Sequence, residues 1–432
     1  MPQNETEIGS ENATAKRNEH DRYESFILRI SFLFVGQFSL YEGFQDWNRG
    51  RADINPPVAI LTILIYGTSL FIIALSLMPS STLHKFKDFS LIPLSLAIIT
   101  SVYVVAEIAY KGAYRTDVLA FSQYAAILFI KGLNPYFQDL TPALAMFNVQ
   151  PSDLTPLSSG SYLLPSTLQY PALHFLIFVP FVVAGLRDMR WVLVAFEFIT
   201  ILVIYKKAPE NLRPMVILPL FAGADLMINF TAASVSDVLW VLPLVGTALT
   251  LDRKPLFSGV LYGVACAIKQ PPWLLAPFLI IYLYQTSSEK AAKKLTQLFR
   301  FVGPAAGVFL AIDLPFAYVN PIGWMMKVVT PISSDLVFLS QGVGVLSQVG
   351  LLNEGRLFYS VLAISVFIVL VGNYCVYFDK LRYMFWIFPG IILWFSFRAL
   401  TSYIIYWMPL MLVSLLLWYN AENPPTSRRR IS

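Results

Sequence analysis

Charged and metal-binding side chains are scarce in this chain of 432 residues. Only 13% of the residues are charged, and there are three histidines and two cysteines. Soluble domains carry about a quarter charged residues, so this composition argues against a globular soluble enzyme. Cys266 and Cys375 stand far apart in apolar segments, which favours small apolar fillers over a disulfide or a metal pair. So few histidines also argue against a histidine-rich metal site, and we expect no metal and no other cofactor.

Motifs of other functional classes are also missing. The sequence contains no Walker-type lysine motif, zinc-spaced cluster or serine nucleophile elbow. The pair Gly342 and Gly344 indicates a flexible turn and is too weak a signal for a nucleotide-binding loop. The net charge of +5 needs no nucleic-acid partner, because basic loops facing anionic lipid explain it.

Apolar sequence is what this chain has in abundance. Hydrophobic residues make up 56% of it, and its mean hydropathy is +0.62. Apolar stretches recur from residue 26 to residue 419, separated by short polar breaks. We therefore predict an all-α polytopic membrane protein with about twelve spans, at 26–44, 58–78, 91–110, 191–205, 214–230, 237–251, 257–268, 272–284, 301–319, 357–378, 383–398 and 399–419. Residues 1–25 and 420–432 are predicted cytoplasmic tails of a single membrane domain, 26–419.

The distribution of lysine and arginine sets the predicted orientation of the chain in the membrane. We expect basic loops on the cytoplasmic side at 206–207, 253–254, 289–300, 380–382 and 428–430. They share one side only if the apolar segment 170–186 does not cross the membrane, so we expect it to dip in and return, or to lie along the interface. The regions 111–190 and 320–356 then become loops on the external face of a plasma membrane or the luminal face of an ER-type membrane.

Asp117 is the strongest single candidate for chemistry. It begins a partly apolar stretch just after a polar break, where the membrane meets water. A carboxylate there suits a general base that takes a proton from an acceptor hydroxyl. The alternative is an interfacial salt bridge with the neighbouring Arg115. Residues 118–130 are predicted to form an interfacial helix that Gly132 ends in a left-handed conformation, and Pro135 is expected to hold the residue before it extended.

Two cations at the predicted external border are candidates for binding phosphate. Lys269 is followed by two prolines that break a long apolar run, and its ammonium can hold phosphate as a point charge. Its alternative role is to extend to the lipid headgroups. Arg398 lies between two apolar segments, where it can bind phosphate through two parallel hydrogen bonds or anchor the corner between two helices.

Other acids lie in the predicted external turns and loops. Asp237 contacts an acceptor hydroxyl or caps the helix that follows, and the sequence favours capping. Asp139 and Asp335 lie in the two long external loops. They stay open as alternatives to Asp117 for the role of base.

Several short motifs, in their order along the chain, resemble the GT-C superfamily of integral-membrane glycosyltransferases. Asp117 resembles the acidic residue of that family's first large external loop. Gly-Leu-Asn-Pro-Tyr at 132–136, followed by Tyr-Pro-Ala-Leu at 170–173, is similar to its "G-x-x-P-Y … Y-x-P-L" pattern. Residues 267–272 resemble its lysine loop before a proline-rich helix start. Pro-Phe at 315–316 and Asn-Pro-Ile-Gly-Trp at 320–324 resemble a segment of related membrane mannosyltransferases.

The resemblance covers residues 111–410 and is closest to the mannosyltransferase branches. It implies a GT-C fold and an inverting transfer of a sugar, mannose in these branches, from a polyprenyl- or dolichyl-phosphate carrier to a glycan or glycolipid acceptor. Asp117 would be the base, and the carrier phosphate would be bound by Lys269, Arg398 and Arg115. The sugar or acceptor would be contacted by Asp237, Gln270, Tyr136 and Tyr403. The partners would be the carrier, the acceptor and membrane lipids.

Two other hypotheses fit the same pattern. A transporter or flippase for a lipid-linked or polar solute would use the buried charges as a translocation path. The long external loops argue against it, as does the lack of a visible internal repeat, which inverted-repeat transporters show in their hydropathy. The third hypothesis is a non-catalytic subunit that binds a glycosyltransferase, with Asp117 in a structural salt bridge.

Overall fold

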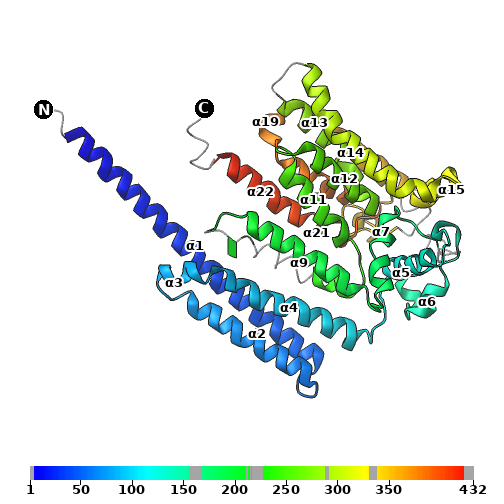
Figure 1. Cartoon of the computed structure of the whole chain (residues 1–432), viewed down its shortest axis with the longest axis horizontal. Coiled ribbons are helices and arrows are strands. Elements are labelled where there is room, and N and C mark those ends of the chain that lie inside the picture. The colour runs from blue at the N-terminus through cyan, green and yellow to red at the C-terminus, as the bar shows by residue number, and fades with distance from the viewer. Residues whose placement is uncertain are drawn as a thin grey trace. The chain divides into compact units, whose positions relative to one another are not determined.

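The computed structural model describes residues 4–154, 167–210, 213–214, 216, 227–287, 291–329 and 338–422. Within these ranges, helices are the only regular secondary structure (Figure 1). Their contacts divide the chain into two compact units, residues 1–109 with 201–228 and residues 110–200 with 229–432. Outside the described residues lie most of the predicted span 214–230, the alternative base Asp335, and the predicted basic tail 428–430.

The first unit is built on three helices that lie side by side, α1, α2 and α4 (Figure 1). Its elements are α1 (Asn4–Gly50), α2 (Pro56–Leu75), α3 (Ser80–Lys85), η1 (Lys87–Ser90), α4 (Leu91–Tyr103) and η2, a π-helical turn (Val104–Ala109). Helix α2 begins where it does because the Asn55 side chain accepts a hydrogen bond from the backbone N–H of Val58 at 3.5 Å, and prolines fill its first turn.

Glycines allow α1 and α2 to pack closely. Gly36, Gly43 and Gly50 are seven residues apart, so they share one face of α1. A Cβ atom on any of them would come within 2.9 Å of a side chain of α2. Small residues of this kind let helix backbones approach in a membrane, where apolar side chains gain little by leaving lipid.

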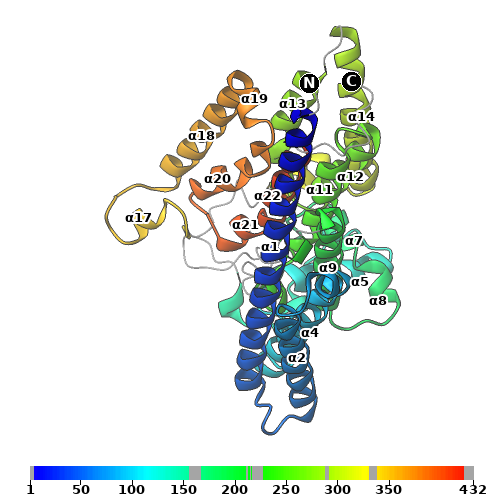
Figure 2. The ribbon, with the colours of Figure 1, turned by 90° about the vertical axis from the view of Figure 1, so that its left-hand side faces the viewer.

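The second unit carries the predicted site. Its elements are α5 (Asp117–Ile130), η3 (Pro135–Phe137), α6 (Pro142–Met146), η4 (Pro151–Asp153), α7 (Leu173–Leu176), α8 (Val179–Val183), α9 (Arg190–Lys207, of which 201–207 are assigned to the first unit), α11 (Val238–Thr250), α12 (Pro255–Ile268), η6 (Pro271–Leu275), α13 (Ala276–Thr286), α14 (Ala291–Ala317), α15 (Pro321–Val328), α17 (Val345–Gln348), α18 (Arg356–Val376), α19 (Phe378–Leu381), η7 (Met384–Trp386), α20 (Phe388–Trp394), α21 (Thr401–Ile405) and α22 (Met408–Glu422). Helices α12 and α14 form its most extensive helix pair, and Figure 2 shows them side by side.

Helix α5 ends as the sequence predicts. Gly132 has a positive φ of 78°. Its N–H donates to the carbonyl of Phe129 at 2.9 Å, and the N–H of Leu133 donates to the carbonyl of Leu128 at 3.1 Å. This is the Schellman arrangement, which satisfies carbonyls left open at a helix end. Asn134 is extended, with ψ of 110°, before Pro135.

The segment 170–186 does not form a helix of spanning length. It contains α7 and α8, of four and five residues, followed by Gly185 with a φ of 81°. A bilayer crossing needs roughly 20 helical residues. These short helices fit a segment that dips into the membrane or lies along the interface, and its place relative to the membrane stays a prediction.

Five helical segments among the described residues are long and apolar enough to cross a membrane. They are 56–75, 87–109, 292–317, 356–376 and 401–422, and they match the predicted spans at 58–78, 91–110, 301–319, 357–378 and 399–419. Helices α11 and α12 are apolar but only 13 and 14 residues long. The structure therefore fits a helical, polytopic membrane protein, with five such segments in its described part where the sequence predicts about twelve.

The contact between α12 and α14 gives a test of the fold. A Cβ on Gly259 of α12 would lie 2.2 Å from the carbonyl oxygen of Phe301 in α14. We expect Gly259→Ala to lower the thermal midpoint of the purified protein. The backbone of α14 cannot rotate away from the new methyl group as a side chain would, so the two helices must move apart, at a cost of about 1–3 kcal/mol. Gly303→Ala, on α14 itself, is the matched control, since nothing lies within 4 Å of its Cβ. Equal midpoints for the two variants would contradict this packing.

Candidate functional site

A buried ion pair joins the start of α11 to the end of α12. The Lys269 ammonium lies 2.8 Å from Asp237 Oδ1, and the two side chains are 6% and 2% exposed. The indole N–H of Trp240 donates to the same oxygen at 3.0 Å. Lys269 has an extended backbone (φ −155°, ψ 161°) and two prolines follow it, so α12 stops at Ile268. This break in the helix leaves the lysine beside Asp237.

Two tyrosines flank the ion pair. The Lys269 nitrogen lies 5.0 Å from the ring centre of Tyr170 and 6.0 Å from that of Tyr403, within the range of cation–π attraction. Burial by itself would lower the pKa of Lys269, but Asp237 raises it, with help from Tyr170 and Tyr403, and the net result is a pKa above the usual value. The lysine is therefore a charged group held inside the protein.

This geometry decides two alternatives that the sequence left open. Lys269 does not extend to the lipid headgroups, because it is only 5% exposed. Asp237 occupies the N-cap position of α11, but its side chain makes no cap hydrogen bond. The interpretation of Asp237 as a helix cap is therefore wrong, because the charge of Lys269 attracts its carboxylate more strongly than the backbone N–H groups do.

Asp117 is the first residue of α5 and is half-buried. The hydroxyl of the preceding residue, Thr116, donates to the carbonyl oxygen of Ser234 at 2.8 Å. Ser234 belongs to the turn that leads into Asp237. One hydrogen bond therefore holds the start of α5 against the turn that carries the ion pair.

Tyr170 is the residue around which the predicted site residues gather. Burial raises the pKa of its hydroxyl above the usual value, and Lys269 lowers it. Tyr403, Asp117 and Asp237 raise it further, so all four side chains are close enough to act on the Tyr170 hydroxyl electrostatically. Lys269, Asp237 and Tyr403 therefore lie together beside Tyr170, and Asp117 acts on the same hydroxyl electrostatically.

The segments that resemble GT-C motifs contact one another. Tyr136 is fully buried, and its hydroxyl donates to the carbonyl oxygen of Tyr170 at 2.5 Å. Its ring lies 6.0 Å from that of Phe316 and 6.2 Å from that of Trp324, between centroids. The side-chain amide of Asn134 donates to the carbonyl oxygen of Phe316 at 3.1 Å. Tyr136 thus supports the Tyr170 backbone, and its contact with substrate stays a prediction.

Two more predicted binding residues are engaged by the protein itself. The side-chain amide of Gln270 donates to the carbonyl oxygens of Gln169 and Val328, at 2.8 and 2.6 Å. Its two N–H groups are therefore used within the fold. Arg115 forms its ion pair with Asp153 at 3.3 Å, and not with Asp117 as the alternative reading of the sequence suggested.

Arg398 lies just before α21 and is half-buried. Its Nη1 atom is buried and has no hydrogen-bond partner among the described residues. A buried N–H group without a partner is costly, and a guanidinium group binds anions well. Arg398 is therefore the candidate phosphate ligand that has a hydrogen-bonding group to spare.

Asp139 is the alternative base that the structure describes. It is exposed, and Oδ1 accepts hydrogen bonds from the hydroxyl and backbone N–H of Thr141 at 2.6 and 2.9 Å. These hydrogen bonds lower the pKa of Asp139, which makes it a weaker base.

A buried histidine beside the cluster was missed by sequence reasoning. The Nδ1 and Nε2 atoms of His174 lie 2.7 Å from the Ser122 hydroxyl and 2.8 Å from the Ser236 hydroxyl, and its ring stacks on Tyr170. Ser122 donates its own hydrogen to the carbonyl of Val118 at 2.7 Å, so His174 donates from Nδ1 and accepts from Ser236 at Nε2. Burial lowers the pKa of His174, which keeps the ring neutral. In the sequence, only its position four residues after Tyr170 indicated that His174 could lie beside that residue.

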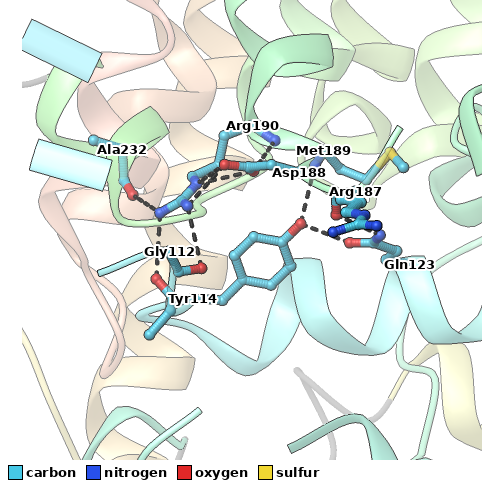
Figure 3. Close-up of polar contacts among 9 residues, drawn as sticks. Gly112, Tyr114, Gln123, Arg187, Asp188, Met189, Arg190 and Ala232 are labelled. Atoms are coloured by element: carbon cyan, nitrogen blue, oxygen red, sulfur yellow. Dashed lines mark hydrogen bonds and ion pairs between the residues drawn. The ribbon is translucent and has the colours of Figure 1, made fainter. Parts of the chain in front are cut away.

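Arg190 was also missed, although it is fully buried at the start of α9. Its Nε atom donates to both carboxylate oxygens of Asp188, each at 2.9 Å. Its terminal nitrogens donate to three carbonyl oxygens, at 3.2 to 3.3 Å, those of Gly112, Ala113 and Ala232 (Figure 3). Arg190 thus ties the loop before Asp117 to the turn before Asp237.

Tyr114 completes this network. Its ring lies 5.3 Å from the Arg190 guanidinium, and its hydroxyl donates to the side chain of Gln123 at 2.6 Å. The same hydroxyl accepts from the backbone N–H of Met189 at 3.0 Å (Figure 3). The network holds α5 through Gln123, so it fixes the helix that Asp117 begins.

Comparison with protein-family models, curated proteins and solved structures finds no match to this chain. Its function is therefore inferred from the motifs and from the geometry around Tyr170.

The Arg190 network predicts a large loss of stability on substitution. We expect Arg190→Ala to lower the free energy of unfolding by about 3–5 kcal/mol, because it strands a partly buried carboxylate and buried carbonyl groups. Arg115→Ala removes an ion pair whose arginine is 43% exposed, and is the matched control, with an expected loss of at most about 1 kcal/mol. The thermal midpoints of the two variants in detergent measure these losses of stability. Equal decreases for Arg190→Ala and Arg115→Ala would show that the Arg190 network does not stabilise the fold more than a surface ion pair does.

Proposed function

We propose that this chain is an inverting glycosyltransferase of the GT-C type. It moves a sugar from a polyprenyl- or dolichyl-phosphate carrier to a hydroxyl group of a glycan or glycolipid on the external or luminal face. The observation that carries the proposal is the buried ion pair of Lys269 and Asp237, which Tyr170 and Tyr403 flank and which lies beside the turn that Thr116 binds. Charged groups close to hydrocarbon are costly and mark sites and pathways. Mannose is proposed as the sugar because the branches that the sequence resembles transfer it.

The proposed chemistry needs one base. Asp117 accepts the proton of the acceptor hydroxyl while the hydroxyl oxygen attacks C1 of the sugar. The bond from C1 to the carrier's phosphate oxygen breaks on the opposite face, and the polyprenyl phosphate leaves with the bonding electrons, which inverts the configuration. Asp117 is preferred because it is half-buried and within electrostatic reach of Tyr170, whereas Asp139 is exposed and held ionised by Thr141.

The proposed phosphate ligand is Arg398. Lys269 is already neutralised by Asp237 at 2.8 Å, so it has little charge left for a leaving phosphate. Arg398 has a buried nitrogen without a hydrogen-bond partner in the described part of the chain. Its charge would offset the negative charge that develops on the phosphate as the bond breaks. Lys269 would have a positioning role, because it holds Asp237 and the two tyrosines in place.

The proposal includes a full membrane architecture. Helices α11, α12, α13 and α20 are apolar but short, and each adjoins a break or a 3₁₀ turn. We take them, together with the apolar part of α1, with α9 and with the predicted span 214–230, as further crossings that bring the count from five to about twelve. Interfacial α5 and short α7 and α8 then lie on the external face.

The base is tested by Asp117→Asn. The assay follows release of polyprenyl phosphate from synthetic polyprenyl-phosphate mannose, with a panel of glycan and glycolipid acceptors. We expect turnover to fall by roughly 10²–10⁴-fold, the range for losing a general base, with an unchanged thermal midpoint. Asp139→Asn is the matched control and should keep its turnover.

Three outcomes would change this assignment. If Asp139→Asn loses turnover and Asp117→Asn does not, the base is Asp139. A wild-type protein that binds the carrier and moves it across a vesicle membrane without releasing phosphate would be a flippase. A wild-type protein that neither binds nor turns over the carrier would contradict the proposal as a whole.

The phosphate ligand is tested by Arg398→Gln. Polyprenyl phosphate, the product, should inhibit the wild-type enzyme, and we expect the variant to bind it about 10- to 100-fold more weakly, as expected for the loss of one charged hydrogen bond. Lys131→Gln, which removes an exposed cation of the same external region, is the control. Unchanged product inhibition in Arg398→Gln would remove Arg398 from the site.

A further inference from the structure

A second polar cluster lies in the first unit, inside the bundle of α1, α2 and α4. The buried face of α1 carries Ser39, Glu42 and Asp46, which are at most 2% exposed. Two carboxyl groups are thus removed from water between helices, two of which are candidate membrane spans. Acidic groups in that position are costly to keep and usually serve a site or a pathway.

Close approaches between α1 and α2 give their register. A Cβ on Gly36 would lie 2.9 Å from the carbonyl oxygen of Ser69, and one on Gly43 would lie 2.9 Å from the ring of Tyr66. A Cβ on Gly50 would lie 2.8 Å from the side chain of Val58. The helices are therefore antiparallel, and as residue numbers rise on α1 they fall by nearly the same number on α2.

This register brings hydroxyl groups to the acidic face. It places Thr62 opposite Asp46, and Ser69 opposite Ser39. Both Thr62 and Ser69 belong to the buried face of α2. From α4, the Ser101 hydroxyl donates to Asp46 Oδ2 at 2.9 Å. The π-helical turn η2 starts three residues later, and such turns occur often at functional sites.

Four hydroxyl groups of the three helices, including that of Thr100 on α4, have no partner in the described part of the protein. The side-chain oxygens of Ser39, Thr62, Ser69 and Thr100 are fully buried and have no hydrogen-bond partner among the described residues. A helical serine or threonine can satisfy itself on the carbonyl four residues back, as Thr68 does on Leu64 at 2.7 Å. Thr62, which the register places level with Asp46, does not do so, and this is an independent sign that something else binds it. Ser39 and Ser69 lie two helical turns farther along, about 10 Å away, so they are not ligands of the same ion.

We propose that the α1–α2–α4 bundle binds a small monovalent cation, Na⁺ or one of similar hardness. Asp46 supplies the charge, and the Thr62 hydroxyl with neighbouring hydroxyl groups supplies neutral oxygen ligands. Hard cations take oxygen ligands of this kind. The site is separate from the proposed transferase site and does not depend on that function.

The test is the stability of the purified full-length protein in nanodiscs as Na⁺ replaces choline at constant ionic strength. A ligand that binds only the folded state raises stability as its concentration exceeds the dissociation constant. We expect the thermal midpoint of the wild type to rise with the logarithm of Na⁺ concentration. Asp46→Asn and Thr62→Val should lose this rise, and Thr62→Ser, which keeps the hydroxyl, should retain it.

Thr68→Val is the matched control, because it removes a hydroxyl from the same helix that already has a partner. It should keep the full Na⁺ response. A wild-type midpoint that is the same in Na⁺ and in choline would overturn the proposal, as would an undiminished Na⁺ response in Thr62→Val or Asp46→Asn. A thermal midpoint that changes with pH but not with the concentration of any cation would also overturn the proposal, since the cluster would then bind only protons.

Discussion

The ion pair between Lys269 and Asp237 is the interaction on which the arrangement of the second unit depends. Taking two charges out of water costs several kcal/mol per ion, and only close geometry with further hydrogen bonds offsets it. Here the distance is 2.8 Å, Trp240 donates to the same carboxylate, and Tyr170 and Tyr403 face the ammonium. Trp240 and the two tyrosines lower the cost of burying the pair, and either charge without the other would be buried and uncompensated. The break after α12 places Lys269 beside Asp237.

The same pair limits what chemistry the cluster can do. Lys269 and Asp237 neutralise each other, so neither is a strong phosphate ligand or a strong base. In the function we propose, the reactive roles therefore belong to Asp117, at the start of α5, and to Arg398, before α21. The Arg190 network and the bond from Thr116 to Ser234 then explain how the start of α5 is held at a fixed place relative to the pair.

Local features could be predicted from the sequence, because they are set by the backbone chemistry of adjacent residues. The left-handed end of α5 at Gly132 and the helix break after Ile268 are of this kind. The partners of Lys269, Tyr136 and Gln270 could not be predicted, since each contact joins residues 32 to 101 positions apart. The number of spans stays a prediction, because hydropathy gives short apolar helices such as α11 and α12 the same signal as helices of full spanning length.

In an apolar interior, a buried polar atom either has a partner in the protein or implies one outside it. Tyr136 and Gln270 fall in the first class, since backbone carbonyls accept all of their hydrogens. The Arg398 nitrogen and the Thr62 hydroxyl have no such partner among the described residues, and each lies where we propose a ligand. The glycine face of α1 lets α2 approach closely, and the resulting register places Thr62 level with Asp46. A larger residue at Gly43 would push α1 and α2 apart and would move Thr62 away from Asp46.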